Sequence, residues 1–137
     1  MFHTRKSHQK YVSFPKHTTC PFCEKSSKKE SIAETKYTRV VPNRVHYDVW
    51  ELRNVVDHLL VLPKRHVLSL HDLTDAEKLD VMNVISEYES NGYNLYARAA
   101  SNAQRSVPHQ HTHLIKTSGK PGSFMFYIRR PYFMFKR

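Results

Sequence analysis

The segment 106–115 constrains the fold more than any other, because three histidines alternate in it with single residues. Side chains of an extended chain point alternately to opposite faces, so a strand would place His109, His111 and His113 together on one face. On a helix, at roughly 100° per residue, the same three would spread over about half of the circumference. Pro108 cannot donate to a sheet ladder and favours an extended residue before it, which suits the start of a strand. The pattern therefore predicts a strand with one histidine face.

Three imidazoles on one face have three interpretations. A histidine can attack phosphorus as a nucleophile when a hydrogen bond orients its other ring nitrogen. Neutral histidines can also ligate a metal. The third interpretation is a basic, partly solvated strand, which is less surprising in a chain with ten histidines among 137 residues. The flanking residues, Ser106-Val107-Pro108 before and Leu114-Ile115 after, favour a functional site.

The same segment resembles the signature of the histidine triad (HIT) family, His-φ-His-φ-His-φ-φ, in which φ is apolar. Leu114 and Ile115 match the closing pair, whereas Gln110 and Thr112 stand where apolar residues are usual. These departures lie on the face away from the histidines, so they concern the packing behind the strand. The family consists of nucleotidyl hydrolases and transferases, and the resemblance implies such an activity here.

The length suits one domain, with 39% hydrophobic residues. We expect no membrane span, because no apolar run approaches about 18 residues. The basic N-terminus lacks the apolar core of a secretory signal. Two cysteines separated by two residues do not form a disulfide framework, so we expect a cytoplasmic protein.

The net charge of +10 predicts attraction to polyanions, namely nucleotides, nucleic acid or an anionic surface. Much of the charge falls near the ends, which divides the chain into a basic arm (1–18), a HIT-like domain (19–128) and a basic, aromatic tail (129–137). The tail can stack on bases and neutralise phosphates, or it can pack on a second subunit. We favour packing, since no pattern fixes a nucleic-acid-binding fold.

Hydrophobic patterns predict an α+β fold, with an antiparallel sheet of about five strands and one main helix. The predicted strands cover residues 37–41, 45–52, 57–63, 93–99, 106–115 and 124–128. The near-continuous apolar run before Pro63 indicates burial on both faces. Thr74 and Glu77 form a capping box for a helix that ends at Asn91-Gly92. Its apolar stripe, assigned to the core, comprises Leu79, Val81, Met82, Ile85 and Tyr88.

Cys20-Pro21-Phe22-Cys23 has three interpretations. Two thiolates so spaced can bind one tetrahedral zinc, with two further ligands from distant positions. A redox pair requires the motif to open a helix after a strand, which the polar, basic flanks do not resemble. Unligated thiols are the third interpretation. We favour structural zinc.

The segment 57–66 also resembles the family, which carries Gly-His-φ-φ-φ-φ-Pro-Lys there, with Asp57 in place of the glycine. In zinc-containing members this histidine joins the cysteine pair and the first triad histidine. The resemblance therefore implies a closed, structural zinc site with the ligands Cys20, Cys23, His58 and His109. The alternative for His58 is a core histidine.

For catalysis, the resemblance implies that His111 attacks the α-phosphorus of a nucleotide and forms a nucleotidyl-histidine, which water or another acceptor resolves. His113 would contact phosphate oxygens, and Ser106 would hydrogen-bond the phosphate or the leaving group. Arg105, with Gln104 beside it, lies near the usual glutamine of the family. A guanidinium there would stabilise a polyphosphate leaving group.

The family places Asp or Asn about eight residues before the equivalent of His58, which falls on Trp50, with Glu51 next to it. With a loop one residue shorter, Glu51 would accept hydrogen bonds from the ribose hydroxyls. Trp50 would line the base pocket, or it belongs to the core.

The first hypothesis is an enzyme that cleaves phosphoanhydrides or phosphoramidates of nucleotides, such as adenosine phosphoramidate and dinucleoside polyphosphates. The family also implies a homodimer. The alternative hypothesis is a zinc-stabilised nucleic-acid-binding module with a vestigial triad.

Overall fold

The computed structural model describes residues 9, 19–24 and 29–121. Six strands form one antiparallel sheet in the order β1-β2-β4-β6-β5, with β3 paired to β4. The strands are β1 Ala33–Glu34, β2 Thr38–Pro42, β3 Val49–Trp50, β4 Arg53–Pro63, β5 Asn94–Ala97 and β6 Thr112–Pro121. The short 3₁₀ helix η1 spans Leu70–Asp72, and the α-helix α3 spans Asp75–Ser90. The predicted α+β fold is confirmed, with six strands rather than about five.

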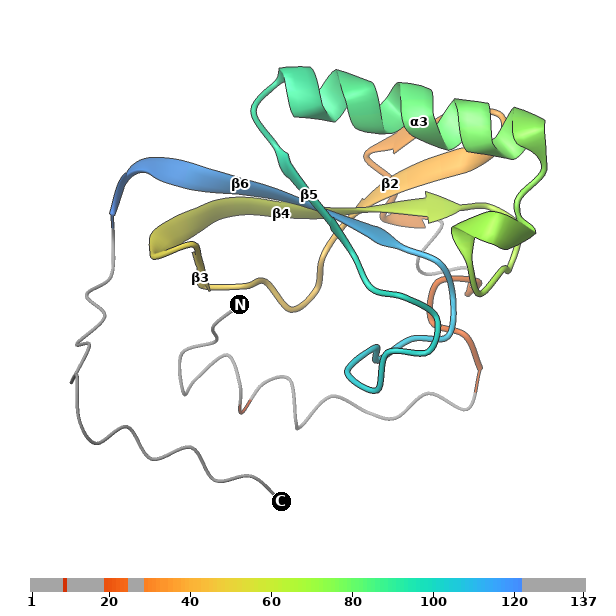
Figure 1. Ribbon diagram of the computed structural model, residues 1–137, viewed down its shortest axis with the longest axis horizontal. Coiled ribbons are helices and arrows are strands. Elements are labelled where there is room, and N and C mark those ends of the chain that lie inside the picture. Colours follow the sequence, from red (N-terminus) through yellow and green to blue (C-terminus); the bar gives the residue numbers. More distant parts are fainter. Residues whose placement is uncertain (1–8, 10–18, 25–28, 122–137) are drawn as a thin grey trace.

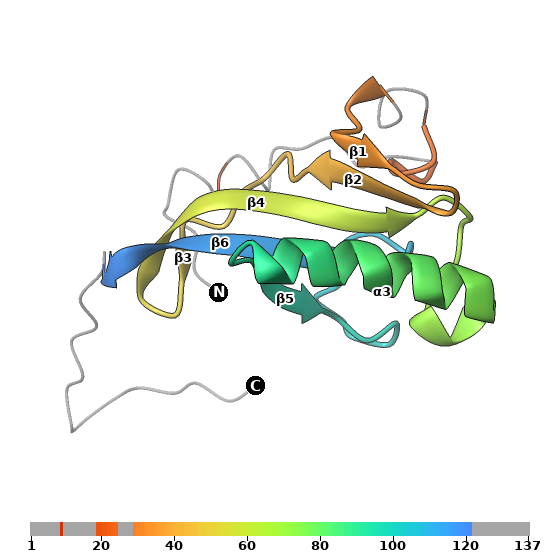
Figure 2. The same cartoon turned by 90° about the horizontal axis from the view of Figure 1, so that it is seen from above.

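Helix α3 covers one face of the sheet, as Figures 1 and 2 show from two directions. In Figure 1 the connections from β2 to β3 and from β5 to β6 pass on the other side of the sheet. The β5–β6 connection carries five of the residues predicted for the site, namely Gln104, Arg105, Ser106, His109 and His111. No helix of the described residues is both long enough and apolar enough to cross a membrane.

The helix starts as its sequence predicts. The Thr74 hydroxyl accepts from the Glu77 N–H at 3.3 Å, and the Glu77 carboxylate accepts from the Thr74 N–H at 2.8 Å. The predicted stripe is wrong in part, because Leu79 and Met82 are 63% and 58% exposed. The face that packs on the sheet instead contains Val81, Val84 and Ile85, with Tyr88 partly buried beside them.

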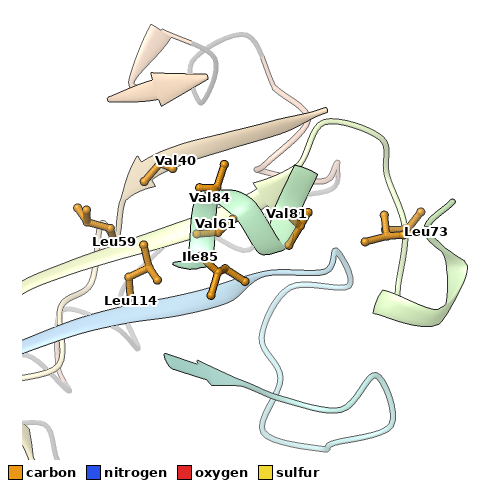
Figure 3. Packing of buried hydrophobic residues seen from close by; sticks show 9 residues of the cluster. Val40, Leu59, Val61, Leu73, Val81, Val84, Ile85 and Leu114 are labelled. Atoms are coloured by element: carbon orange, nitrogen blue, oxygen red, sulfur yellow. The ribbon is translucent and has the colours of Figure 1, made fainter. Parts of the chain in front are cut away.

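Residues 58–63 of strand β4, which contain the predicted apolar run, are buried on both faces, as predicted. On the helix side, Leu59 and Val61 pack with residues of β2, β6 and α3 (Figure 3). On the other side, Leu60 and Leu62 pack with Val41, and Phe22 of the cysteine loop packs against them. The sheet therefore separates an apolar core under the helix from a second layer on the open face.

The structure departs most from the predicted strands 45–52 and 106–115. In addition, β4 begins at Arg53, four residues before its predicted start, β5 is shorter than predicted, and β1 was not predicted. Only Val49–Trp50 is a strand within 45–52, because the preceding backbone turns toward the sheet and the Tyr47 N–H bonds the His58 ring. Strand β6 starts at Thr112 rather than near Ser106, because the Gln110 N–H donates to the Val67 carbonyl, at 2.7 Å, instead of to a neighbouring strand. The predicted arm (1–18, except residue 9), strand 124–128 and tail (129–137) lie outside the described residues.

Candidate active site and metal centre

The three triad histidines lie close together in the interior. His113 belongs to β6, whereas His109 and His111 precede that strand. His109 is 0% exposed, His111 5% and His113 6%. The ring centroids of His111 and His113 are 5.2 Å apart. Phe22 contacts the rings of His109 and His111 edge-on, at 5.8 and 5.4 Å. Because Phe22 packs on the open face of the sheet, the histidine cluster lies on the side away from α3.

His111 is held in one tautomer. Its Nδ1–H donates to the backbone carbonyl of His109 at 2.7 Å, so Nδ1 keeps the proton and Nε2 keeps the lone pair. Burial lowers the pKa of His111, and the charges of Arg105 and Arg98 lower it further. At neutral pH the ring is therefore uncharged and has the form a nucleophile requires.

His113 is oriented through His58. The Tyr47 N–H donates to Nδ1 of His58 at 3.0 Å, so a neutral His58 carries its proton on Nε2. That Nε2–H donates to Nδ1 of His113 at 2.9 Å. Burial, then the neighbouring His58, His111 and Arg98, lower the pKa of His113 to about 2. Its proton therefore lies on Nε2, a buried donor that has no hydrogen-bond partner among the described residues.

The first triad histidine faces the cysteines. Nε2–H of His109 donates to the Pro63 carbonyl at 3.0 Å, which leaves the lone pair on Nδ1. That Nδ1 lies 3.5 Å from the sulfurs of both Cys20 and Cys23, and Nδ1 of His66 lies 3.4 Å from Cys23. All four ligand atoms lie within 4.8 Å of one another.

This donor set fits zinc. A tetrahedral ion with bonds of about 2.0–2.3 Å holds its ligand atoms roughly 3.3–3.8 Å apart, which matches the sulfur–nitrogen separations of the cluster. Two sulfurs and two imidazoles would leave no open coordination position, as in structural sites. The cluster is therefore a candidate metal centre.

The structure brings Cys20, Cys23 and His109 together but places His58 elsewhere, against His113. The fourth side chain of the cluster is His66, so we replace His58 by His66 in the ligand set. His58 lies on β4, whereas His66 follows Pro63, whose carbonyl binds His109. The Pro-Lys-Arg-His sequence after the strand was the available signal for His66.

An aromatic cluster flanks His113 on the open face. Tyr47 and Tyr96 contact its ring at centroid distances of 5.3 and 5.8 Å. Trp50 stacks beside Tyr47 at 6.0 Å and contacts Tyr96 at 5.2 Å. Trp50 is therefore near the histidines, as either of its predicted roles allows. Glu51 lies at the exposed β3–β4 turn, with a positive φ of 50°.

The three polar residues before the triad differ in burial. Arg105 is partly buried and its Nη1 donates to the Leu68 carbonyl at 2.6 Å, while its charge acts on His111. Ser106 and Gln104 are exposed. The Gln104 N–H donates to the side chain of Asn102 at 2.8 Å, within the connecting loop. Among these three residues, only Arg105 is partly buried.

A family model, the HIT domain, matches residues 54–120. No curated protein matches the sequence. Among solved structures, a hypothetical protein from Leishmania major is 25% identical, with a TM-score of 0.57, over 79% of this chain and 80% of that chain. A histidine triad nucleotide-binding protein from Candida albicans is 21% identical, with a TM-score of 0.56, over 86% and 87%.

A HIT family hydrolase from Legionella pneumophila is 21% identical, with a TM-score of 0.51, over 74% of this chain and 94% of that chain. The likeness to the Candida and Legionella proteins concerns the fold. Residues 54–120, which include His58 and the three triad histidines, thus match the HIT domain in sequence, and the described chain has the fold of HIT proteins of known structure.

Proposed function

We propose that the protein is a nucleotide hydrolase or nucleotidyl transferase of the HIT type, which acts on phosphoanhydride or phosphoramidate bonds through a nucleotidyl-histidine. The observation that carries the proposal is the hydrogen bond from Nδ1 of His111 to the His109 carbonyl. It directs the lone pair to Nε2 of a neutral, buried ring, as a nucleophile toward phosphorus requires.

In the first step, Nε2 of His111 forms a bond to the α-phosphorus while the bond from phosphorus to the leaving group breaks. The electron pair of that bond departs with the leaving group. His111 then carries a positive charge, which its Nδ1–H shares with the His109 carbonyl. The Nε2–H of His113 is available to a phosphate oxygen, since no described residue takes this hydrogen bond.

In the second step, a water oxygen bonds to phosphorus and the P–N bond breaks, so its electron pair returns to Nε2 of His111. The water loses one proton to solvent. An acceptor other than water would give transfer instead of hydrolysis. Ser106 would contact the phosphate or the leaving group, and Glu51 the ribose, as the resemblance implies.

We propose Tyr47, Trp50 and Tyr96 as one wall of the nucleoside site, because these rings lie beside His113 and a base can stack on them. Cys20, Cys23, His66 and His109 would hold zinc. Zinc bound there would stabilise the fold, since the closed donor set offers no open position for substrate. The cytoplasmic location and the homodimer stay predictions.

The nucleic-acid-binding alternative depends on the basic arm and tail, which lie outside the described residues. No described contact favours it over the enzyme.

Turnover of adenosine 5′-phosphoramidate and diadenosine triphosphate tests the enzyme. We expect His111→Ala to abolish turnover of both compounds and His71→Ala, an exposed histidine on η1, to leave it unchanged. Turnover that survives in the His111 variant would refute the assigned nucleophile.

A further inference from the structure

Phe22 connects the candidate metal centre to the proposed nucleophile. It stands between Cys20 and Cys23 in the cysteine loop, residues 19–24. Its ring contacts the ring of His111 edge-on, with 5.4 Å between the centroids and 67° between the planes. The two catalytic steps proposed for His111 do not use this contact, although it touches the ring that attacks phosphorus.

The orientation of the His111 ring depends on such contacts. The hydrogen bond from Nδ1 to the His109 carbonyl fixes the tautomer, but the ring can still tilt about the line of that bond and carry Nε2 with it. Two edge-on neighbours limit this tilt, Phe22 at 5.4 Å and His113 at 5.2 Å. Attack on phosphorus requires a lone pair that is aimed at the reacting atom, so the Phe22 contact bears on the rate of the first step.

The position of Phe22 is set by the turn that carries it. The Cys23 N–H donates to the Cys20 carbonyl at 3.0 Å, which closes a tight turn with Pro21 at its second position, where proline is favoured. The Phe22 carbonyl accepts from Nη2 of the buried Arg39 at 2.9 Å. The Phe22 ring packs on the apolar cluster of the open face. The middle of the turn is therefore attached to the sheet.

Metal ligation would hold the same turn at both ends. The sulfurs of Cys20 and Cys23 each lie 3.5 Å from Nδ1 of His109, and the four ligand atoms of the candidate centre lie within 4.8 Å of one another. The cysteine loop belongs to no helix or strand, so the hydrogen-bond ladder of such an element does not keep it in place. An ion bound by both sulfurs would fix the turn, and with it the Phe22 ring.

We propose that Phe22 is a positioning residue for His111 and that metal binding by the cysteine loop controls turnover through the Phe22 ring. The inference rests on the proposed function and adds a control of its nucleophile. When the metal is bound, the turn holds the Phe22 ring against His111, and Nε2 is directed at the substrate. When the metal is lost, the turn relaxes and fewer His111 rings have the orientation for attack.

A second route from the metal centre to the nucleophile runs through His109. Its ring is a candidate ligand, and its carbonyl accepts the Nδ1–H of His111. This route would act on the tautomer of His111, whereas Phe22 acts on the tilt of the ring. The Nε2–H of His109 also donates to the Pro63 carbonyl, so this ring has a backbone anchor that does not depend on the metal. The structure therefore favours the route through Phe22.

The test combines zinc removal with Phe22→Leu, which keeps an apolar side chain on the sheet but removes the ring. Full-length wild type and variant are assayed with excess zinc and again after treatment with a chelator, and metal analysis reports the zinc content of each sample. The substrate is whichever of adenosine 5′-phosphoramidate and diadenosine triphosphate the wild type cleaves faster. We expect Phe22→Leu with zinc to lower kcat about tenfold at unchanged KM, because the contact serves the transition state rather than binding.

Zinc removal should lower kcat about tenfold in wild type but less than about twofold in Phe22→Leu, since the variant has already lost the contact that the metal controls. Tyr88→Leu is the matched control. Tyr88 is partly buried on the helix face of the sheet and contacts Tyr93 edge-on, also at 5.4 Å. Its replacement should leave kcat and the zinc dependence of kcat within about twofold of wild type.

A second readout does not depend on activity. The nuclear Overhauser effect between the ring protons of Phe22 and His111 should be present with zinc and absent without it. The nitrogen-15 chemical shifts of the His111 ring should remain those of the Nδ1–H tautomer in both samples, because the His109 carbonyl keeps its hydrogen bond. A change of tautomer on zinc removal would place the control at His109 and overturn the role of Phe22.

Equal factors of loss on zinc removal in wild type and Phe22→Leu would also overturn the inference, since zinc would then act through His109 or through the fold as a whole. The same holds for a wild type that binds no zinc and for an Overhauser effect that survives zinc removal. Turnover that depends on His111 would leave the proposed function standing in each of these cases. If the wild type turned over neither compound in a His111-dependent manner, the proposed function would fail, and this inference with it.

Discussion

The backbone carbonyl of His109 accepts the Nδ1–H of His111 at 2.7 Å, while the ring of His109 faces the two cysteine sulfurs at 3.5 Å. One residue therefore belongs to the candidate metal centre through its side chain and fixes the tautomer of the proposed nucleophile through its backbone. The Nε2–H of the same ring is bound to the Pro63 carbonyl, so its orientation is set from both sides. This arrangement links the cysteine loop to the chemistry of the next histidine.

The first prediction concerns the ligand set. His66→Ala should lower the zinc content of purified protein from about one equivalent to less than roughly a tenth, because three ligands leave a weak, open site. His58→Phe should keep the zinc, since His58 contacts His113 rather than the cysteines. Metal analysis of both proteins, purified in parallel, is the measurement. Loss of zinc in the His58 variant with retention in the His66 variant would restore the ligand set inferred from the family resemblance.

This exchange of one histidine for another shows where sequence reasoning ends. The C-x-x-C spacing and the alternation of the triad predict that Cys20, Cys23 and His109 have the chemistry of ligands. Whether His58 or His66 reaches them depends on the chain after Pro63 and on the β2–β3 connection, whose Tyr47 N–H binds the His58 ring. Both are tertiary features, so the Pro-Lys-Arg-His sequence offers a second candidate histidine but does not decide between the two.

Other parts of the fold also fall into features that a local sequence pattern predicts and features that depend on distant residues. The capping box of Thr74 and Glu77 is a local signal, and the helix begins where it indicates. The apolar run 59–62 predicts a strand buried on both faces because its composition leaves no polar side. The exposure of Leu79 and Met82 could not be predicted, because apolar residues on this helix cover more than the one face that meets the sheet. The late start of β6 depends on the distant Val67 carbonyl.

The second prediction concerns His58 as a positioning residue. His58→Phe removes the Nε2–H that donates to Nδ1 of His113. Without this hydrogen bond, the proton of the His113 ring can lie on either nitrogen, so both tautomers should be populated. We expect kcat/KM to fall by at least about tenfold, as happens when a catalytic histidine loses its tautomer-fixing partner. Nitrogen-15 chemical shifts of the His113 ring report the tautomer directly. A single His113 tautomer in the variant, with unchanged kcat/KM, would contradict this role.

The third prediction concerns Arg39, which is 2% exposed. Its Nη2 donates to the Phe22 carbonyl at 2.9 Å, next to Cys23, while Nε and Nη1 have no hydrogen-bond partner among the described residues. Arg39 therefore anchors the cysteine loop on the sheet. Arg39→Met should raise the dissociation constant for zinc roughly 10–100-fold, as the loss of outer-shell partners does.

Competition with a chromogenic chelator measures this constant. Arg53→Met is the matched control, because the Arg53 guanidinium also binds a backbone carbonyl, that of Gly119. Equal zinc affinities in the two variants would show that Arg39 does not support the metal centre.

The fourth prediction uses Trp50, the single tryptophan of the chain. If Trp50 lines the nucleoside site, titration with adenosine monophosphate should change its fluorescence and saturate at one nucleotide per chain. Trp50→Ala should raise KM more than it lowers kcat, because it removes contact area shared by substrate and transition state. If the fluorescence did not change at saturating nucleotide, although the protein still turned over substrate, Trp50 would be a core residue and not part of the nucleoside site.

The fifth prediction concerns the ion pair that joins the turn after β4 to the helix. Arg65 lies beside His66, and its guanidinium binds the Glu77 carboxylate at 2.6 and 2.9 Å. The hydrogen bonds from Arg65 and from the Thr74 backbone lower the pKa of Glu77 from 4.5 to about 2. Because folding lowers this pKa, the stabilisation is complete above pH 4.5 and is lost as the pH falls toward 2.

Glu77→Gln keeps a side chain that can serve in the capping box but removes the charge. The variant should therefore unfold at a temperature a few degrees below wild type at pH 7, and the difference should shrink between pH 4.5 and 2. Thermal unfolding followed by circular dichroism across this range measures both effects. Asp75→Asn is the control, since Asp75 is fully exposed in its pair with Lys78 and should change the midpoint little at any pH. A Glu77→Gln difference that stayed constant from pH 7 to pH 2 would mean that packing, rather than the Arg65 charge, holds the carboxylate, and the turn that carries His66 would then not depend on this ion pair.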